Sequence, residues 1–480
     1  MDGVSASIAY EAASGPLSDP RVQVAVLVVI GAVLASMARR AGAASPAAGA
    51  ADDVAIDDAP PSGRGALRAL RALRNRRFAL LWTGQTLSRI GDYVYEIVLA
   101  WWVLEVTGSA AVMGAVLIVT FLPTAVFTII GGAVVDRVPR LAVMLASDVL
   151  RAVAVLGVAA WAYAGHLTLW PIYALGLLFG IADAFFNPAY FALVPELVDE
   201  ADLPSANALT SMSFQLGRVV GPVIGGLIVA AGGVKLGLTI NGISFVLAAA
   251  LLVPLLRRAA RRDAGDEAAP SPDANAAPPR GMLADVRDGF AAVAGSPIIR
   301  TGILVNALAA ACLVGPFLVA MPFLVADRFD KDPRVLGFLL AFFPIGFVLG
   351  SLWGGRHDRL PHRGRVMYGG LAVAALMLTL YGLPVPLPVL AAAALVNGFA
   401  LELTGLAWTG LLQDLIPADK LGRAASLDQL AGFIAIPIAF AAAGWSTEHV
   451  GAAQTFLVGG AMAAVLAGVA LAIPAVWKAA

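Results

Sequence analysis

The chain has 480 residues, of which 60% are apolar and only 13% are charged, and its formal net charge is zero. Soluble domains carry roughly 25% charged residues, so this composition excludes a soluble globular protein and favours a chain with many membrane-spanning helices. A neutral chain has no general attraction to nucleic acid. The single cysteine, Cys312, excludes a disulfide within the chain.

The first 64 residues, 1–64, differ from the rest of the chain. Residues 22–38 form a largely apolar run, which acidic residues precede and Arg39 and Arg40 follow. A signal peptide would carry positive charge ahead of its apolar run. Two interpretations stay open, namely an extra N-terminal span or a segment upstream of the working start of the protein. The composition of residues 41–63 indicates a flexible tether.

Windows of about 20 apolar residues, enough helix to cross a bilayer core, recur along the rest of the chain. They predict an all-α polytopic protein with twelve transmembrane helices in two pseudo-symmetric halves. The six predicted spans of the N-terminal half, 65–256, lie near residues 78–104, 109–132, 141–163, 168–190, 206–231 and 234–256. The six of the C-terminal half, 298–480, lie near residues 298–325, 334–355, 365–385, 388–412, 424–446 and 451–476. The linker between them, 257–297, ends in a stretch with the periodicity of a helix on the membrane surface, 282–295.

Arginine and lysine predict the orientation, because the loops that hold most of them stay in the cytoplasm. Most of these residues precede the first predicted span, follow the second and the eighth, or lie in the linker. The opposite loops hold four, Lys235, Arg328, Lys331 and Arg334. We therefore expect a protein of the cytoplasmic (inner) membrane, with both ends of the twelve-span core in the cytoplasm.

A short charged motif occurs twice. "GAVVDRVPR" (132–140) follows the second predicted span, and "GGRHDRLPHR" (354–363) follows the eighth. Each contains Gly, three residues, Asp-Arg, one residue and Pro. Segments 192–209 and 410–427 also align, with Glu196 over Asp414. Two related halves of six spans are typical of many secondary transporters.

These two loops predict a gate on the cytoplasmic side. An Asp at such a corner can meet the positive N-terminal end of a helix from the other half, and the Arg can pair with a carboxylate or a lipid phosphate. The alternative is a plain turn with helix-capping residues. The candidate gate residues are Gly132, Asp136, Arg137, Arg140, Gly354, Asp358 and Arg359.

The first loop resembles the signature of the major facilitator superfamily, except that Pro139 stands where that family usually has Gly. "FALLWTGQTLSRIGDYVYEIVLAWWVLEVTGS" (78–109) and "FFNPAYFALVPELV" (185–198) are similar to its bacterial exporter branch, which includes macrolide efflux proteins and the enterobactin exporter. The resemblance covers about residues 68–478 without the linker. It implies that Asp136 and Arg137 belong to a gate that stabilises the outward-facing state.

The fifth predicted span contains "GRVVGPVIGG" (217–226), which is similar to the antiporter motif of that family and implies export by antiport. A Pro beside a glycine face gives a bent helix that packs closely against a neighbour. Ordinary packing of small residues is the alternative. The motif residues are Gly217, Gly221, Pro222, Gly225 and Gly226, and the second half lacks the Gly-Pro pair.

Ionisable residues inside predicted spans are costly and therefore mark functional candidates. Arg89, Asp92 and Glu96 share one face of the first span. Arg89 can neutralise one of the two carboxylates, and the other would be desolvated, as a proton-coupling group requires. The alternative is a structural ion-pair network, which is how Asp148 with Arg151 is interpreted.

Three further candidates lie in other spans. Arg218 is a counter-ion of Asp92 or a ligand for an anionic substrate, and Glu402 binds a proton or a cationic substrate. Asp183 lies nearer the cytoplasm. Together with the acids of the first span, these residues are the predicted lining of the substrate cavity.

The sequence contains no Gly-Lys-Ser/Thr phosphate loop, no metalloprotease His pair and no Gly-x-Ser-x-Gly elbow. We therefore expect no enzyme, no cofactor and no metal site. The prediction is a monomeric transporter in the lipid bilayer that exports small amphipathic molecules, such as drugs or macrolides, by alternating access in exchange for protons. Export of a siderophore or transport of a lysophospholipid by the same fold stays open. A transport-inactive membrane sensor is the alternative from another class.

Overall fold

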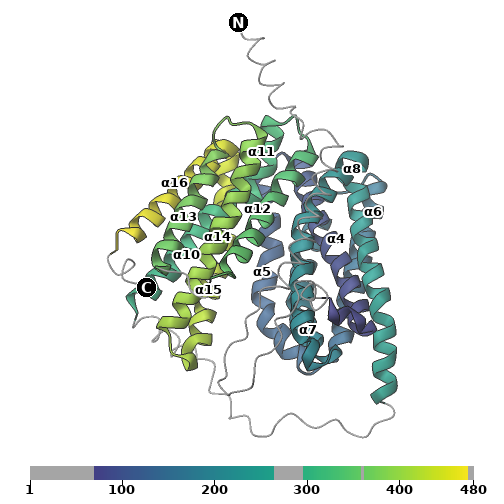
Figure 1. The fold of residues 1–480 in the computed structure, drawn as a ribbon. Coiled ribbons are helices and arrows are strands. Elements are labelled where there is room, and N and C mark those ends of the chain that lie inside the picture. The colour runs from purple at the N-terminus through teal and green to yellow at the C-terminus, as the bar shows by residue number, and fades with distance from the viewer. Residues whose placement is uncertain (1–69, 264–295, 358–361, 474–480) are drawn as a thin grey trace, which may run out of the picture.

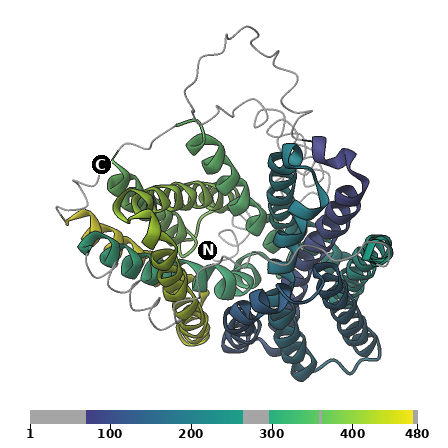
Figure 2. The same ribbon diagram turned by 90° about the horizontal axis from the view of Figure 1, so that it is seen from below.

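The computed structural model describes residues 70–263, 296–357 and 362–473. Every regular element within these ranges is a helix. Figure 1 shows two bundles side by side, one from purple to teal and the other from green to yellow. They remain separate groups when seen along the bundles in Figure 2. The first bundle therefore comes from the N-terminal part of the chain and the second from the C-terminal part.

The N-terminal bundle begins with a short 3-10 helix, η2 (Arg71–Arg74). Its long helices are α4 (Arg76–Thr107), α5 (Ala110–Val135), α6 (Arg140–Tyr163), α7 (Leu169–Leu197) and α8 (Leu203–Asp263). A second 3-10 turn, η3 (Glu200–Asp202), precedes α8. α8 consists of two helices joined at Gly233, where φ is 69°. Only glycine adopts such a backbone readily, and the break falls between the two predicted spans 206–231 and 234–256.

The C-terminal bundle begins with three helical segments that follow one another without a gap, namely α10 (Pro297–Gly315), the π-helical turn η4 (Pro316–Ala320) and α11 (Met321–Arg328). Together they correspond to the predicted span 298–325. The remaining helices are α12 (Pro333–Gly354), α13 (Arg363–Leu380), α14 (Leu387–Leu415), α15 (Ala418–Val450) and α16 (Ala452–Leu471).

Nine helices within the described residues are long and apolar enough to cross a membrane. One of them, Glu200–Arg257, has 58 residues, enough for two crossings of a bilayer core. Large apolar side chains such as Trp170 and Val153 are exposed on the outside of the bundles, where lipid would cover them. The chain is therefore an all-helical, multi-pass membrane protein, and the number of twelve spans stays a prediction.

Some predicted features lie outside the described residues. They are the N-terminal span at 22–38 with its tether, the surface helix at 282–295, and the gate residues Asp358 and Arg359. We call the end of the molecule where α4 ends and α5 begins the outer end, following the orientation predicted from the arginines and lysines.

Candidate functional site

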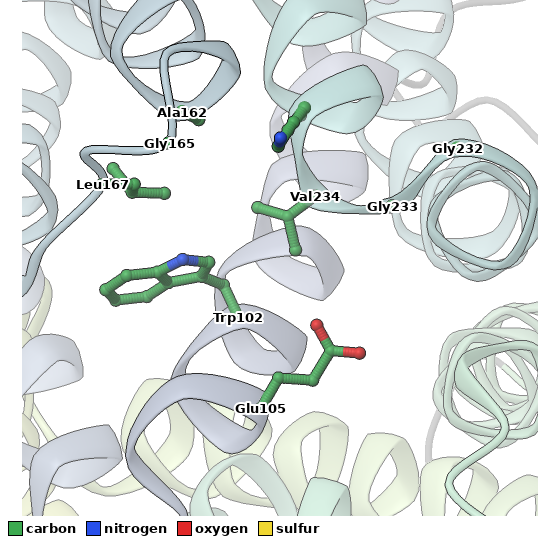
Figure 3. A pocket seen from close by; sticks show the side chains of 9 residues that line it. Trp102, Glu105, Ala162, Gly165, Leu167, Gly232, Gly233 and Val234 are labelled. Atoms are coloured by element: carbon green, nitrogen blue, oxygen red, sulfur yellow. The ribbon is translucent and has the colours of Figure 1, made fainter.

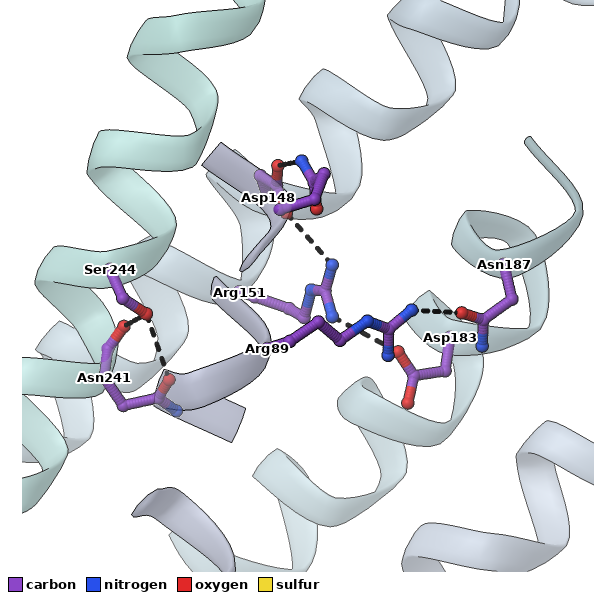
Figure 4. A network of polar contacts seen from close by, with 8 residues as sticks. Arg89, Asp148, Arg151, Asp183, Asn187, Asn241 and Ser244 are labelled. Atoms are coloured by element: carbon purple, nitrogen blue, oxygen red, sulfur yellow. Dashed lines mark hydrogen bonds and ion pairs between the residues drawn. The ribbon is translucent and has the colours of Figure 1, made fainter. Parts of the chain in front are cut away.

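A buried charge network lies in the N-terminal bundle around Arg151 of α6 (Figure 4). One guanidinium nitrogen of Arg151 lies 3.0 Å from Asp148 on the same helix, and the other lies 3.2 Å from Asp183 of α7. Gln85 of α4 donates a hydrogen bond to Asp148 over 3.2 Å. Arg151 and Asp148 are almost fully buried, so each compensates the other's lost hydration.

Aromatic rings enclose the same guanidinium. Arg151 lies 4.7 Å from the ring centre of Phe186 and 4.6 Å from that of Phe245, within the range of a cation–π interaction. The ion pair between Asp148 and Arg151 that the sequence predicted is therefore present. Asp183, predicted as a cavity residue, belongs to the network as its second carboxylate.

Arg89 of α4 contacts α7 and α8 in place of the acids on its own helix. Its guanidinium donates to the side chain of Asn187 of α7 and lies 4.4 Å from the ring centre of Phe214 of α8. Within the described residues it makes no ion pair with Asp92 or Glu96. The direct pairing with a carboxylate of its own helix is therefore not present, because the long side chain of Arg89 reaches across to α7, although Arg89 remains within electrostatic range of Asp92.

The two acids of α4 have different surroundings. Asp92 is half-buried, and its Oδ1 has no hydrogen-bond partner among the described residues. It lies within electrostatic range of Arg151 and Asp183. Glu96, one turn further along the helix, is exposed and lies within electrostatic range of Arg218. One acid therefore adjoins the buried network, and the other is reached by water.

Arg218 of α8 connects the two bundles. Its guanidinium lies 5.4 Å from the ring centre of Phe347 and 5.9 Å from that of Phe343, both on α12. Glu402 of α14 is 8% exposed and accepts a hydrogen bond from Ser351 of α12. It also lies within electrostatic range of Arg218. The predicted charged residues of the two halves thus adjoin each other around α12.

The charged loops at the inner end form equivalent ion pairs, each within its own bundle. Arg140 pairs with Glu196 of α7 and donates to the carbonyl oxygen of Ala192 over 3.1 Å. In the other bundle, Arg363 pairs with Asp414 of α14 and donates to the carbonyl oxygen of Gly410 over 2.6 Å. Glu196 and Asp414, which the sequence aligns, thus have equivalent arginine partners in the two bundles.

The other candidate gate residues of the first loop lie at the end of α5 and are exposed to solvent or only partly buried. Asp136 ends α5 through its backbone N–H, and both Asp136 and Arg137 are exposed. A methyl group at Gly132 would meet nothing within 4 Å, whereas one at Gly131 would meet the carbonyl oxygen of Ala184 of α7. The close approach of α5 to α7 is thus made at Gly131 and not at the candidate gate residue Gly132.

In the second loop, the close approach is made at Gly354, which is one of the candidate gate residues. A methyl group at Gly354 would collide with the side chain of Leu406 of α14. In both bundles, therefore, a glycine at the end of the helix packs on the helix that carries the paired acid.

The glycines of the predicted antiporter motif face two different helices. A methyl group at Gly217 would lie 2.8 Å from the ring of Tyr93, and one at Gly221 3.0 Å from the carbonyl oxygen of Ile90, both on α4. Gly225 also faces α4. Gly226 instead faces α12, where a methyl group would lie 2.5 Å from the carbonyl oxygen of Pro333. The motif therefore packs α8 inside its bundle and also joins the two bundles.

The contact between the bundles is built twice at the outer end. In the crossing of α8 and α12, Gly226 faces the carbonyl of Pro333, and Gly337 faces the carbonyl of Pro222. In the crossing of α5 and α15, Gly444 faces the carbonyl of Ala110, and Gly114 faces the carbonyl of Phe440.

The two crossings are equivalent by the repeat in the sequence. Gly226 and Gly444 are 218 positions apart, as are Pro222 and Phe440, and 218 is the offset of the aligned segments. The ring of Phe121 adds a contact of 5.8 Å to that of Phe433 between α5 and α15. The sequence shows the duplication, and the structure shows that equivalent residues of the two copies form the contacts between the bundles.

A cavity of about 340 Å³ lies at the outer end within the N-terminal bundle. Figure 3 shows the ring of Trp102 close to Leu167 and Val234, with Glu105 further along the same helix. The bend of α8 at Gly232 and Gly233 forms another side. None of the candidates that lie within the described residues lines this cavity, so it is separate from the charged groups described above.

The family model of the Major Facilitator Superfamily matches residues 81–435 and 301–478. The chain belongs to this family. Its members are transporters, so the chain is a membrane transport protein and not an enzyme.

Bacterial exporters are among the relatives. The multidrug efflux pump Tap of Mycolicibacterium fortuitum is 28% identical over 76% of this chain and 88% of its own length. Macrolide efflux protein A of Streptococcus pyogenes is 23% identical over 80% of this chain and 93% of its own. The enterobactin exporter EntS of Escherichia coli O1:K1 / APEC is 29% identical over 61% of this chain and 67% of its own. The predicted resemblance to the bacterial exporter branch is confirmed.

Sequence reasoning left out several residues of the site. The sequence predicts Arg151 only as a structural partner of Asp148, and it does not single out Gln85 or Asn187. Asn187 lies in the quoted segment 185–198, where a polar side chain among aromatic residues was the available signal. Gln85 lies one turn before Arg89, and an amide inside an apolar span is a comparable signal.

Proposed function

We propose that the protein is a secondary active transporter of the cytoplasmic membrane, which exports small amphipathic molecules by alternating access in exchange for protons. The relatives named above support export as the direction. Their printed substrates differ, and we propose the general class of small amphipathic molecules for this chain. An efflux assay can also test a siderophore as the exported molecule.

The pair of acids on α4 carries the proposal of proton exchange. Asp92 has a buried oxygen without a hydrogen-bond partner among the described residues, and it adjoins the Arg151 network. Glu96, one turn away, is exposed. A proton that arrives from water at Glu96 and moves to Asp92 would change the charge beside Arg151. A change of charge at that place alters the electrostatic energy of α4, α6 and α7 together.

The bundle contacts support alternating access. The two glycine crossings join the bundles at the outer end, while the ion pairs of Arg140 and Arg363 at the inner end stay within their own bundles. We infer that this arrangement is the inward-facing state. In the outward-facing state the glycine crossings would separate and the charged inner loops would meet the opposite bundle.

Efflux of a macrolide and of a cationic dye from cells that express the chain tests this function. Asp92→Asn and Glu96→Gln keep the size of each side chain and remove its charge. We expect export by the parent chain, loss of export with a protonophore, and loss of export in at least one of the two variants. Glu105→Gln is the matched control, because Glu105 lies on the same helix at its outer end and is exposed; we expect it to export like the parent.

Other outcomes select other functions. Export that survives both the protonophore and the substitutions contradicts proton exchange and favours facilitated export or movement of a lysophospholipid between leaflets. Absence of transport for every compound, including a siderophore and a lysophospholipid, contradicts the proposed transport and favours the alternative of a transport-inactive membrane sensor.

A further inference from the structure

The N-terminus of α5 receives its hydrogen bonds partly from the other bundle. Ser109, the residue before the helix, accepts from the backbone N–H of Val112 over 3.3 Å. Glu448 of α15 accepts from the backbone N–H of Ala111 over 2.8 Å and from the hydroxyl of Ser109 over 2.6 Å. The first N–H groups of a helix have no partner inside the helix. The carboxylate of Glu448 therefore caps α5 from a different bundle.

The position of Glu448 is unfavourable within its own helix. It lies in the last turn of α15, which ends at Val450. The C-terminal end of a helix carries a partial negative charge, which disfavours a carboxylate, whereas the N-terminal end attracts one. The arrangement becomes favourable only because the N-terminus of α5 lies opposite. The contribution of this carboxylate therefore depends on the bundles being together.

The equivalent crossing lacks this feature. By the 218-residue offset of the repeat, Glu448 corresponds to Ala230 of α8. The residue before α12 is Asp332, which accepts from the N–H of Arg334 over 2.9 Å and forms an ion pair with the Arg334 side chain. α12 is thus capped by its own segment. In the described chain, the α5–α15 crossing alone adds a carboxylate to the contacts of the glycines.

Water reaches the cap. A cavity of about 310 Å³ lies beside it and is lined from both bundles. The N-terminal bundle provides residues 107–110, and the C-terminal bundle provides Phe323, Asp327, Thr447, Glu448, Gly451 and Ala452. Glu448 itself is exposed. Its hydrogen bonds can therefore break and form again without moving an uncompensated charge through an apolar region.

We propose that Glu448 is a latch that holds the outer end closed by capping α5 from the opposite bundle, and that these two hydrogen bonds break whenever the outer end opens. This inference rests on the proposed alternating access. It adds a residue that sets the balance between the two states, whereas the glycines only permit close approach. A similar latch is not built at the α8–α12 crossing.

The distance between the bundles at the outer end tests the latch. Spin labels at His166→Cys in the loop between α6 and α7 and at Val389→Cys in the first turn of α14, in a Cys312→Ala background, report this distance by double electron–electron resonance in liposomes. Both labelled positions are exposed. Loss of a helix cap costs roughly 1 kcal/mol, so we expect Glu448→Ala to raise the ratio of open to closed outer ends about fivefold.

Two further variants keep the test decisive. Glu448→Gln keeps an oxygen acceptor without the charge, and we expect a smaller shift in the same direction; it replaces the alanine variant if that one fails to fold. Glu105→Ala removes another exposed carboxylate of the outer end, whose one hydrogen-bond donor among the described residues is Trp101 of its own helix. We expect this control to keep the ratio of the parent.

The outcomes separate the latch from the transport function. A ratio in Glu448→Ala and Glu448→Gln equal to that of the parent overturns the latch, as does an equal shift in Glu105→Ala. These ratios are measured without substrate, so they are informative even if efflux fails. A parent whose distance does not change when substrate and a proton gradient are added contradicts alternating access instead.

Discussion

Arg151 is the residue on which the buried charges of the N-terminal bundle depend. It is the ion-pair partner of both Asp148 and Asp183. Arg151→Met keeps much of the side-chain volume but leaves two carboxylates without their cation. Removal of one partner from a buried ion pair costs about 3–5 kcal/mol, so we expect a marked fall in the thermal unfolding temperature of the purified protein in detergent.

Arg140→Met is the comparison for this prediction. Arg140 also pairs with a carboxylate, but Arg140 and Glu196 are partly exposed, and such pairs contribute roughly 0–1 kcal/mol. We expect a small change of the unfolding temperature. Equal changes in the two variants would contradict the special position of Arg151.

At the scale of single residues, the sequence identifies candidates better than partners. A charge inside an apolar run is a local property, so Arg89, Asp92 and Glu96 could be singled out from the spans alone. The pair Asp148–Arg151 could be predicted because both residues lie on one helix. The partner of Arg89 is Asn187 on another helix, and helical spacing carries no information about that contact.

The glycines of α5 and α8 give a prediction at the scale of helix elements. Gly221→Ala places a methyl group against the Cβ of Tyr93 of α4. Overpacking of this kind costs typically ~1–3 kcal/mol, so we expect a lower unfolding temperature and reduced export. Gly132→Ala places its methyl group in open space, and alanine favours the helix.

Gly132→Ala tests whether the loop motif needs a glycine at this position for helix packing. Thermal unfolding of both variants in detergent gives the comparison, and Gly132→Ala should match or exceed the parent. A clear loss of stability in Gly132→Ala would show that the loop glycine has a packing role in this state that the structure does not contain.

The extents of most elements follow from the sequence because about 20 apolar residues and charged ends define a span. The break in α8 at Gly233 falls between two predicted spans. The face of a helix is harder to predict. In 217–226, the sequence indicates a small-residue surface, but Gly225 and Gly226 are neighbours that point to different helices. Their partners depend on how α8 is rotated in the bundle.

At the scale of the whole molecule, duplication is visible in the sequence and the meeting of the two copies is not. The offset of 218 residues aligns Glu196 with Asp414 and also Gly226 with Gly444. The first pair makes equivalent ion pairs within the bundles, and the second makes equivalent contacts between them. The alignment is the same in both cases, so only the arrangement of the bundles in space distinguishes contacts within a bundle from contacts between bundles.

Substitutions at the neighbouring glycines Gly225 and Gly226 of α8 therefore distinguish the stability of one bundle from the closure of the two bundles at the outer end. Gly226→Ala adds a methyl group 2.5 Å from the carbonyl oxygen of Pro333, across the bundle interface, whereas Gly225→Ala adds one 3.0 Å from the Cβ of Ile97 inside the bundle. With the same pair of spin labels, we expect Gly226→Ala to increase the population with an open outer end at least fivefold, since ~1 kcal/mol of overpacking opposes closure. We expect Gly225→Ala to lower the unfolding temperature with little change of that population.

Gly444→Ala extends this comparison to the second crossing. Its methyl group would lie 2.8 Å from the carbonyl oxygen of Ala110, so it should open the outer end as Gly226→Ala does. In a rigid movement of one bundle against the other, both contacts are lost together when the outer end opens, so the free-energy changes of the two substitutions add. We therefore expect the double variant to raise the ratio of open to closed outer ends by about the product of the two single changes. A ratio well below that product would contradict a rigid movement that separates both crossings at once.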